Sequence, residues 1–61
     1  MIAVHQLQPG DYVTEQIDGR AMRLDIIAIV PQGRQVEVTF RSPLGLSRAN
    51  YLATACMAAQ R

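Results

Sequence analysis

The sequence predicts a mainly β protein, a small and strongly bent antiparallel sheet with a short C-terminal helix at about residues 48–60. Three observations support this prediction. Two runs rich in β-branched residues, 22–30 and 34–40, flank a Pro-Gln-Gly segment, and such residues favour strands. Glycine and proline separate the shorter apolar runs. The residues after position 47 are instead rich in alanine, which has the highest helix propensity.

The length of the chain limits it to one small domain, residues 1–61, with a marginal core. A domain of this size buries only about 60% of the surface that its unfolded chain exposes. Cys56 has no partner for an intrachain disulfide, and Cys56 and His5 are too few to hold a structural zinc ion. We therefore expect close packing or, with more weight, a homodimer to stabilise the fold. We expect no metal and no cofactor.

The first third of the chain predicts two strands joined by turns. Residues 1–6 alternate loosely and form a short first strand in this prediction. Pro9 and Gly10 then indicate a turn, because proline presets φ and glycine relaxes the steric limits. Residues 11–16 contain Tyr, Val and Thr, which favour a strand. Asp18-Gly19 indicates the next turn.

The hairpin formed by residues 22–30 and 34–40 is the most strongly predicted element. A three-residue loop, 31–33, would place Val30 opposite Arg34. In that register one face of the hairpin is apolar, because side chains alternate along a strand. The residues of this predicted core face are Leu24, Ile26, Ala28, Val36, Val38 and Phe40.

The opposite face of the same hairpin carries two isoleucines, Ile27 and Ile29. Two large apolar side chains on a solvent face predict that another element or a second subunit covers them. We therefore expect Ile27 and Ile29 to form an oligomer or partner interface.

The C-terminal region predicts a helix that docks on the sheet. Leu46 and Ser47 end a brief last strand, and Ser47 is a suitable N-cap. Leu52, Cys56 and Ala59 would then line one apolar stripe. An isolated helix of this length is marginal in water, so we expect it to pack against the sheet.

Four residues are the predicted binding site: Arg34, Arg41, Arg48 and Tyr51. Arginines beside an exposed aromatic ring can hold phosphates while the ring stacks on a base. The alternative is that Arg23, Arg34 and Arg41 are solvated and pair with Asp25 and Glu37 across the sheet.

Residues 45–52, GLSRANYL, resemble the signature near the end of SH3 domains, and residues 7–13, LQPGDYV, resemble the entry to an SH3-like barrel. Gly45, Leu46, Asn50 and Tyr51 match the signature, whereas its proline is absent. The chain also has no tryptophan, and a tryptophan pair forms the proline-peptide groove of that family. The resemblance therefore implies an SH3-like barrel fold and not the ligand site.

The chain also resembles the carbon storage regulator family of small RNA-binding translational repressors. An apolar start, MIAV, a Gly-x-Gln-Val hairpin at residues 33–36, and Pro43 before Leu46 and Arg48 carry this resemblance. It implies an intertwined dimer that grips RNA with arginines, Arg48 among them. The basic cluster of the family's first strand is replaced here by residues 5–7, His-Gln-Leu. This is our second choice of family.

The leading expectation for function is a small regulatory binding module, not an enzyme, that contacts RNA or DNA through arginines. His5 has no nucleophile at a recognisable spacing, and no acidic pair or glycine-rich phosphate loop is present. The alternative is a protein-interaction adaptor or assembly subunit that uses an apolar outer face. The single cysteine and the lack of a long apolar run indicate a bacterial-type cytoplasm and no membrane partner.

Overall fold

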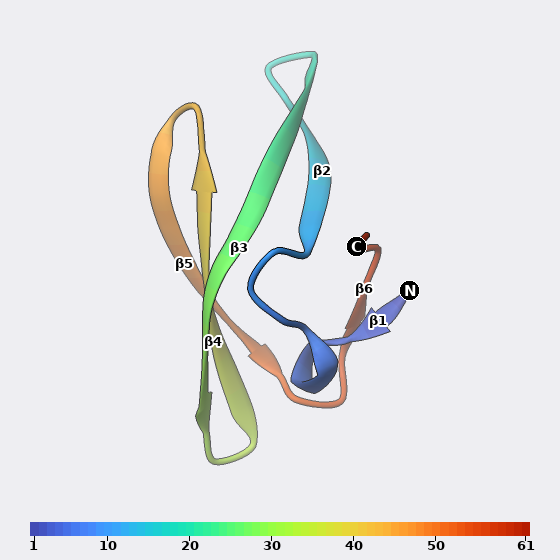
Figure 1. The fold of residues 1–61 in the computed structure, drawn as a ribbon, viewed down its shortest axis with the longest axis vertical. Helices are drawn as coiled ribbons and strands as arrows, with labels where there is room; N and C mark the ends of the chain where they lie inside the picture. Colours follow the sequence, from blue (N-terminus) through green and yellow to red (C-terminus); the bar gives the residue numbers. More distant parts are fainter.

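The structure, a computed structural model of residues Met1–Arg61, consists of six strands and one short 3-10 helix (Figure 1). They are β1 (Ile2–Ala3), η1 (Val4–Gln6), β2 (Tyr12–Ile17), β3 (Arg20–Gln32), β4 (Gln35–Ser42), β5 (Gly45–Leu52) and β6 (Cys56–Met57). A four-stranded antiparallel sheet has the order β2-β3-β4-β5, and β1 pairs with β6. The prediction of a mainly β, antiparallel protein is confirmed.

The turns of the large sheet follow from glycine placement. Asp18 (φ 51°) and Gly19 (φ 78°) are both left-handed between β2 and β3, which is the requirement of a type I′ turn. Gly33 (φ 65°) precedes Arg34 between β3 and β4, and glycine at the first central position is typical of a type II′ turn. Both turn types match the right-handed twist of the strands that they join.

The predicted register of the β3–β4 hairpin is wrong. Its turn contains two residues, Gly33 and Arg34, so that Val30 lies opposite Glu37 instead of Arg34. The register changes again between Ile26 and Ala28, where β3 contains a bulge. A bulge adds one residue to a strand and thereby changes which residues face each side. The two departures compensate before the bulge, so Leu24 and Ile26 keep the predicted face and are buried with Val36, Val38 and Phe40. Ala28, between the bulge and the turn, lies opposite Thr39 on the other face, and its predicted place on the core face is wrong.

The bulge separates the two isoleucines that were predicted to lie together. Ile29 lies opposite Val38, and it packs against the core as a partly buried residue. Ile27 is the extra residue of the bulge and is half-buried. In an unbroken strand, residues 27 and 29 lie on the same face because side chains alternate. The bulge breaks this alternation, so the two isoleucines need not share a face.

The predicted C-terminal helix is absent, and this prediction is wrong. Ser47 lies inside β5 and therefore caps no helix. Beyond β5 the chain turns at Ala53–Thr54, where Ala55 donates its N–H to the Leu52 carbonyl at 2.9 Å, and then forms β6. From the end of β5 onward, alternate residues pack against the core: Tyr51, Ala53, Ala55, Met57 and Ala59. Leu52 and Cys56, the expected buried stripe, are exposed. Helix propensity is a weak preference that tertiary packing overrides. The chain contains no helix long and apolar enough to cross a membrane.

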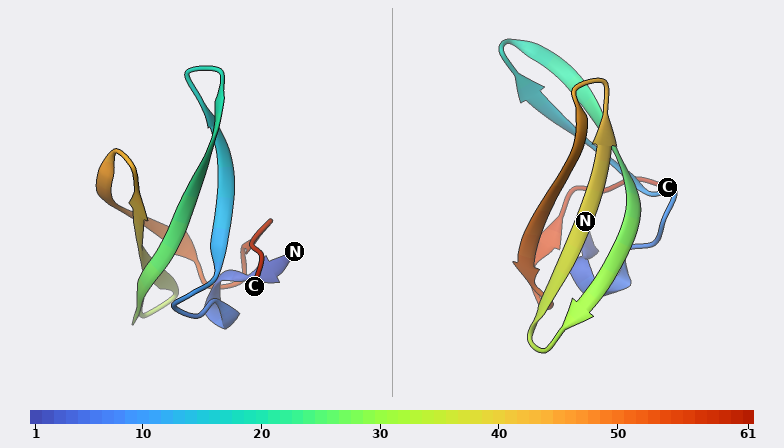
Figure 2. Two further views of the ribbon diagram at one scale, coloured as in Figure 1. Left: turned by 45° about the horizontal axis from the view of Figure 1, so that its top comes forward. Right: turned by 90° about the vertical axis from the view of Figure 1, so that its left-hand side faces the viewer.

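The terminal segments cover one side of the core (Figure 2). Val4 donates its backbone N–H to Ala55 at 2.8 Å, and Ala53 donates to the Arg34 carbonyl at 2.9 Å. The core contains residues from both terminal and sheet segments: Val4, Leu7, Val13, Leu24, Ile26, Val36, Val38 and Phe40. The sheet bends strongly and its two hairpin ends diverge, so the strands do not close into a barrel (Figures 1 and 2).

A buried carboxylate fixes the corner between the N-terminal segment and β2. Asp11 is only 4% exposed. Its Oδ2 accepts the Gln8 N–H at 2.9 Å, and its Oδ1 lies 3.4 Å from the Arg61 Nε. Arg61 Nη2 also donates to the Gln6 carbonyl at 3.1 Å. The last residue of the chain is thereby attached to the first turn.

Candidate functional site

We call the face of the four-stranded sheet that carries Val36, Val38 and Phe40 its inner face, and the opposite face its outer face. Arg41 and Arg48 both lie on the outer face. Arg41 is opposite Leu46 and Arg48 is opposite Thr39, which makes the two arginines diagonal neighbours. Such neighbours lie within reach of long side chains. Both side chains are exposed.

The other two residues of the predicted binding site lie elsewhere. Arg34 is in the β3–β4 turn, at the far end of β4 from Arg41. Tyr51 is opposite Val36, a buried core residue, and so lies on the inner face. The structure therefore brings Arg41 and Arg48 together and places Arg34 and Tyr51 away from them.

Of the alternative ion pairs predicted for the arginines, one between Arg23 and Asp25 is present, but it lies within β3 and not across the sheet. Asp25 pairs with Arg23, at 2.8 Å from Nε to Oδ1, and the Arg23 guanidinium lies 3.8 Å from the centre of the Tyr12 ring. Arg34, Arg41 and Arg48 make no salt bridge. The two outer-face arginines are thus unpaired cations.

The apolar side chains exposed on the outer face are not the pair that was predicted. Ile29 belongs to the core, while Ile27 stays half-buried in the bulge. Val30 and Leu52, exposed by 45% and 59%, share the outer face with Arg48, as their ladder partners show. Their positions depend on the actual turn and on β5, neither of which the sequence predicted correctly.

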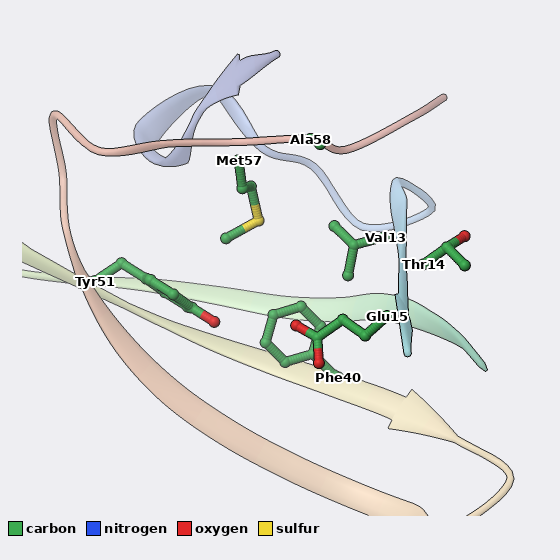
Figure 3. Close-up of a pocket in the computed structure, with 7 residues that line it drawn as sticks. All are labelled: Val13, Thr14, Glu15, Phe40, Tyr51, Met57 and Ala58. Carbon is green, nitrogen blue, oxygen red and sulfur yellow. The ribbon is translucent and has the colours of Figure 1, made fainter. Parts of the chain in front are cut away.

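The inner face extends beyond the core into a groove. A first hollow of about 220 Å³ lies between β2, β5 and the C-terminal segment (Figure 3). Its lining residues are Val13, Thr14, Glu15, Phe40, Tyr51, Met57 and Ala58. In Figure 3 the side chains of Tyr51, Phe40 and Met57 point into this space from three different elements. The hollow is therefore mostly apolar, with polar groups at its rim.

A second hollow of about 250 Å³ continues towards the β4–β5 turn. Its lining residues are Glu15, Ile17, Leu24, Ser42, Leu44, Gly45, Leu46 and Ser47. Glu15 lines both hollows and is the only charged residue in either. We call the two hollows together the seam groove, because they follow the gap between β2 and β5.

Glu15 has an unusual setting within the seam groove. It makes no salt bridge and no side-chain hydrogen bond. Its carboxylate lies in front of the Phe40 ring in Figure 3. Burial raises the pKa of the Tyr51 hydroxyl, and the negative charge of Glu15 raises it further. Glu15 is exposed and therefore places an unpaired carboxylate at the rim of the groove.

The strands on either side of the groove have unpaired edges. β2 and β5 are the two outermost strands of the sheet. Tyr12 pairs with Gln60, but no backbone hydrogen bond outside the ladder involves residues 13–17 or 45–51. Because ladder bonds alternate, every second residue of an outermost strand points its N–H and C=O away from the sheet. Two rows of free donors and acceptors consequently flank an apolar groove.

Sequence reasoning missed Glu15, although the signal was present. Residues 12–17 read Tyr-Val-Thr-Glu-Gln-Ile, and alternation places Val13, Glu15 and Ile17 on one face. Val13 is opposite the buried Leu24, which identifies that face as the inner one. An acidic residue on the apolar face of a strand is the feature that marks the groove.

The structure offers no metal centre among its side chains. No group of three or more His, Cys, Asp or Glu residues lies where it could hold an ion. His5 in η1 and Cys56 in β6 are both exposed.

Comparisons with known protein families, with curated proteins and with solved structures gave no match.

Proposed function

We propose that this protein is a non-enzymatic interaction module that binds an extended polypeptide segment in the seam groove. The observation that carries the proposal is that the unpaired edges of β2 and β5 flank an apolar groove. Edge strands with free backbone groups are templates for another strand. In strand addition the main-chain bonds supply affinity, and pockets for alternate side chains supply specificity. The seam groove combines both features.

The proposal also accounts for the open sheet, which does not close into a barrel. The strand order β2-β3-β4-β5 leaves two edges apart, and a strand between them would remove both edges. In this proposal the fold is an SH3-like barrel that a partner segment completes. We further propose a cytoplasmic regulatory or assembly role, since the exposed Cys56 is a free thiol suited to a reducing compartment.

A peptide-display selection tests the proposal. Random extended peptides are selected against the whole chain, and the backbone amide shifts of the chain are mapped by NMR on titration. We expect the largest shifts in residues 13–17 and 45–51. Ala58→Trp, which fills the first hollow from an exposed position, should abolish binding. Thr54→Trp, an exposed position in the same segment outside the groove, is the matched control.

Two results would contradict the peptide-binding function. One is a set of shifts confined to the outer face. The other is binding that Ala58→Trp and Thr54→Trp affect equally, because only the first of these residues lines the groove.

Nucleic-acid binding is a second candidate, which the unpaired pair of Arg41 and Arg48 on the outer face favours. Two phosphate contacts to a single strand give a salt slope of about −1.4, so affinity should fall about sevenfold between about 50 and 200 mM salt. Fluorescence anisotropy with single-stranded RNA and DNA measures this slope. The variant Arg41→Gln/Arg48→Gln should flatten it, whereas Arg20→Gln should not. No measurable binding at low salt would exclude this function.

Homodimerisation is proposed for the outer face as well, in the form of a contact through Val30, Leu52 and Ile27. The first two are exposed apolar side chains of the outer face, and Ile27 is half-buried in the β3 bulge. Light scattering at micromolar concentration should give more than one chain's mass. Leu52→Ser should then shift the mass towards that of one chain, and a wild-type monomer would remove the proposal.

A further inference from the structure

We propose that the seam groove selects an extended segment of a partner protein that has a basic residue between two apolar residues, in the pattern apolar-x-basic-x-apolar. Glu15 is the specificity-determining residue in this proposal. The inference rests on the proposed function, because it assumes that a strand occupies the groove. It adds the chemistry of the strand that fits.

The inner face of β2 supplies the pattern. Val13, Glu15 and Ile17 follow one another at alternate positions, about 6.6 Å apart along a strand. Val13 lines the first hollow, Ile17 lines the second, and Glu15 lines both. A strand beside β2 presents its own side chains with the same period. Opposite charges facing each other across two strands are favourable, so an apolar-acidic-apolar face fits an apolar-basic-apolar one.

The two apolar positions have different surroundings. The first hollow has the Phe40 and Tyr51 rings and the Met57 thioether in its walls, and such walls suit a large aliphatic or aromatic side chain. The second hollow has Ile17, Leu24 and Leu44 together with two serines. It suits an aliphatic side chain with hydroxyl groups at the rim.

The basic residue is better served by arginine than by lysine. The Glu15 carboxylate makes no salt bridge, and it lines the same hollow as the Phe40 and Tyr51 rings. A guanidinium can bond both carboxylate oxygens and stack on such a ring, whereas an ammonium acts as a compact point charge. Burial by the bound strand would also remove water from the pair. A hydrogen bond to a charged group in such a place contributes about tenfold or more to affinity.

The occupant is a partner protein and not a second copy of this chain. None of the six arginines of the chain has apolar residues at both the second position before it and the second position after it, and the chain has no lysine. Arg48, for example, has Leu46 on one side and Asn50 on the other. A second copy therefore cannot present the pattern that the groove requires.

The experiment uses the whole chain and a capped peptide, Ser-Thr-Leu-Thr-Arg-Thr-Leu-Thr-Ser, in isothermal titration calorimetry. Comparison peptides replace the arginine with lysine, glutamine or glutamate, or move both leucines by one position. Glu15→Gln and Glu15→Arg are the test variants. Glu37→Gln, which removes the same charge from the outer face, is the matched control. Circular dichroism verifies that each variant is folded.

We expect the arginine peptide to bind most tightly and the glutamine peptide about tenfold or more weakly. Glu15→Gln should lower the affinity for the arginine peptide to that for the glutamine peptide and leave the latter unchanged. Glu15→Arg should reverse the preference in favour of the glutamate peptide. Glu37→Gln should leave every affinity unchanged, and the shifted leucines should abolish binding.

Three results would overturn the inference. Equal affinity for the arginine and glutamine peptides removes the role of Glu15 while leaving strand binding intact. Absence of binding by every peptide in the series removes the pattern, and the display selection then decides separately whether the groove binds other strands. Self-association of the chain that Ala58→Trp removes would make a second copy the occupant.

Discussion

The β3–β4 hairpin and the C-terminal segment, residues 53–61, are non-helical for different reasons. The hairpin is rich in β-branched residues and has glycine where the turn needs it. The C-terminal segment has four alanines, which favour helix in isolation. It is not helical because the chain turns at Ala53–Thr54 and alternate residues pack on the core. Local preference therefore explains the first region, and tertiary packing explains the second.

Truncation in the hairpin should have the largest effect of the changes that test this comparison. Phe40 is 5% exposed and contributes to both the core and the wall of the groove. We expect Phe40→Ala to lower the free energy of unfolding by about 3–5 kcal/mol. A domain this small has little more stability than that. Urea denaturation followed by circular dichroism should find the variant largely unfolded, and a midpoint equal to that of wild type would contradict the burial of Phe40.

A charge in the C-terminal segment should distinguish an extended chain from a helix. Ala55 packs against the core, whereas Thr54 is exposed. Ala55→Asp should cost about 1–3 kcal/mol, because a carboxylate would lose water there without gaining a partner. Thr54→Asp should change stability by less than about 0.5 kcal/mol. Thermal melts of the two variants measure the difference, and equal melting temperatures would refute the alternation.

The same alternation shows how far the sequence alone could lead. The apolar face of the hairpin and the turn at Asp18-Gly19 were predictable, since each depends on neighbouring residues. The bulge next to Ile27 was not predictable, because it depends on how the sheet bends over the core. The seam groove was not predictable either, because it depends on how the bend of the sheet positions β2 and β5. Glu15 was visible as an acid on an apolar face, but its meaning required the groove.

The polar contacts of Asp11 and Arg61 attach the C-terminal segment to the first turn. They should contribute less to the free energy of unfolding than the apolar packing of that segment does. Asp11→Ala leaves the Gln8 N–H without its side-chain acceptor and should cost about 1–2 kcal/mol. Arg61→Ala removes only an exposed partner of the same carboxylate and should cost about 0–1 kcal/mol. Urea midpoints of both variants test this order. A larger loss of stability for Arg61→Ala than for Asp11→Ala would mean that the Arg61 contact stabilises the fold more than the Gln8–Asp11 hydrogen bond does.

The smallest expected effect concerns Tyr51, which lies in β5, the strand that precedes the C-terminal segment. Burial raises the pKa of its hydroxyl above the ordinary tyrosine value, and the charge of Glu15 adds to this. A raised pKa means that the folded state holds the phenol proton more tightly than the unfolded state does. Stability from this group is therefore fully present below the ordinary tyrosine pKa and is lost as the pH rises through the folded-state pKa.

Phenolate absorbance in a Tyr12→Phe background isolates the titration of Tyr51, because the chain has only these two tyrosines. Glu15→Gln should lower the Tyr51 pKa part of the way towards its ordinary value, and burial should maintain the remainder. Tyr51→Phe should remove the loss of stability at alkaline pH that this group causes. Binding of the arginine peptide should raise the Tyr51 pKa through further burial and lower it through the new cation beside Glu15. The arginine and glutamine peptides should bury the hydroxyl alike, so the Tyr51 pKa should be lower in the arginine complex if the guanidinium reaches Glu15. Equal Tyr51 pKa values in the two complexes would place the arginine elsewhere.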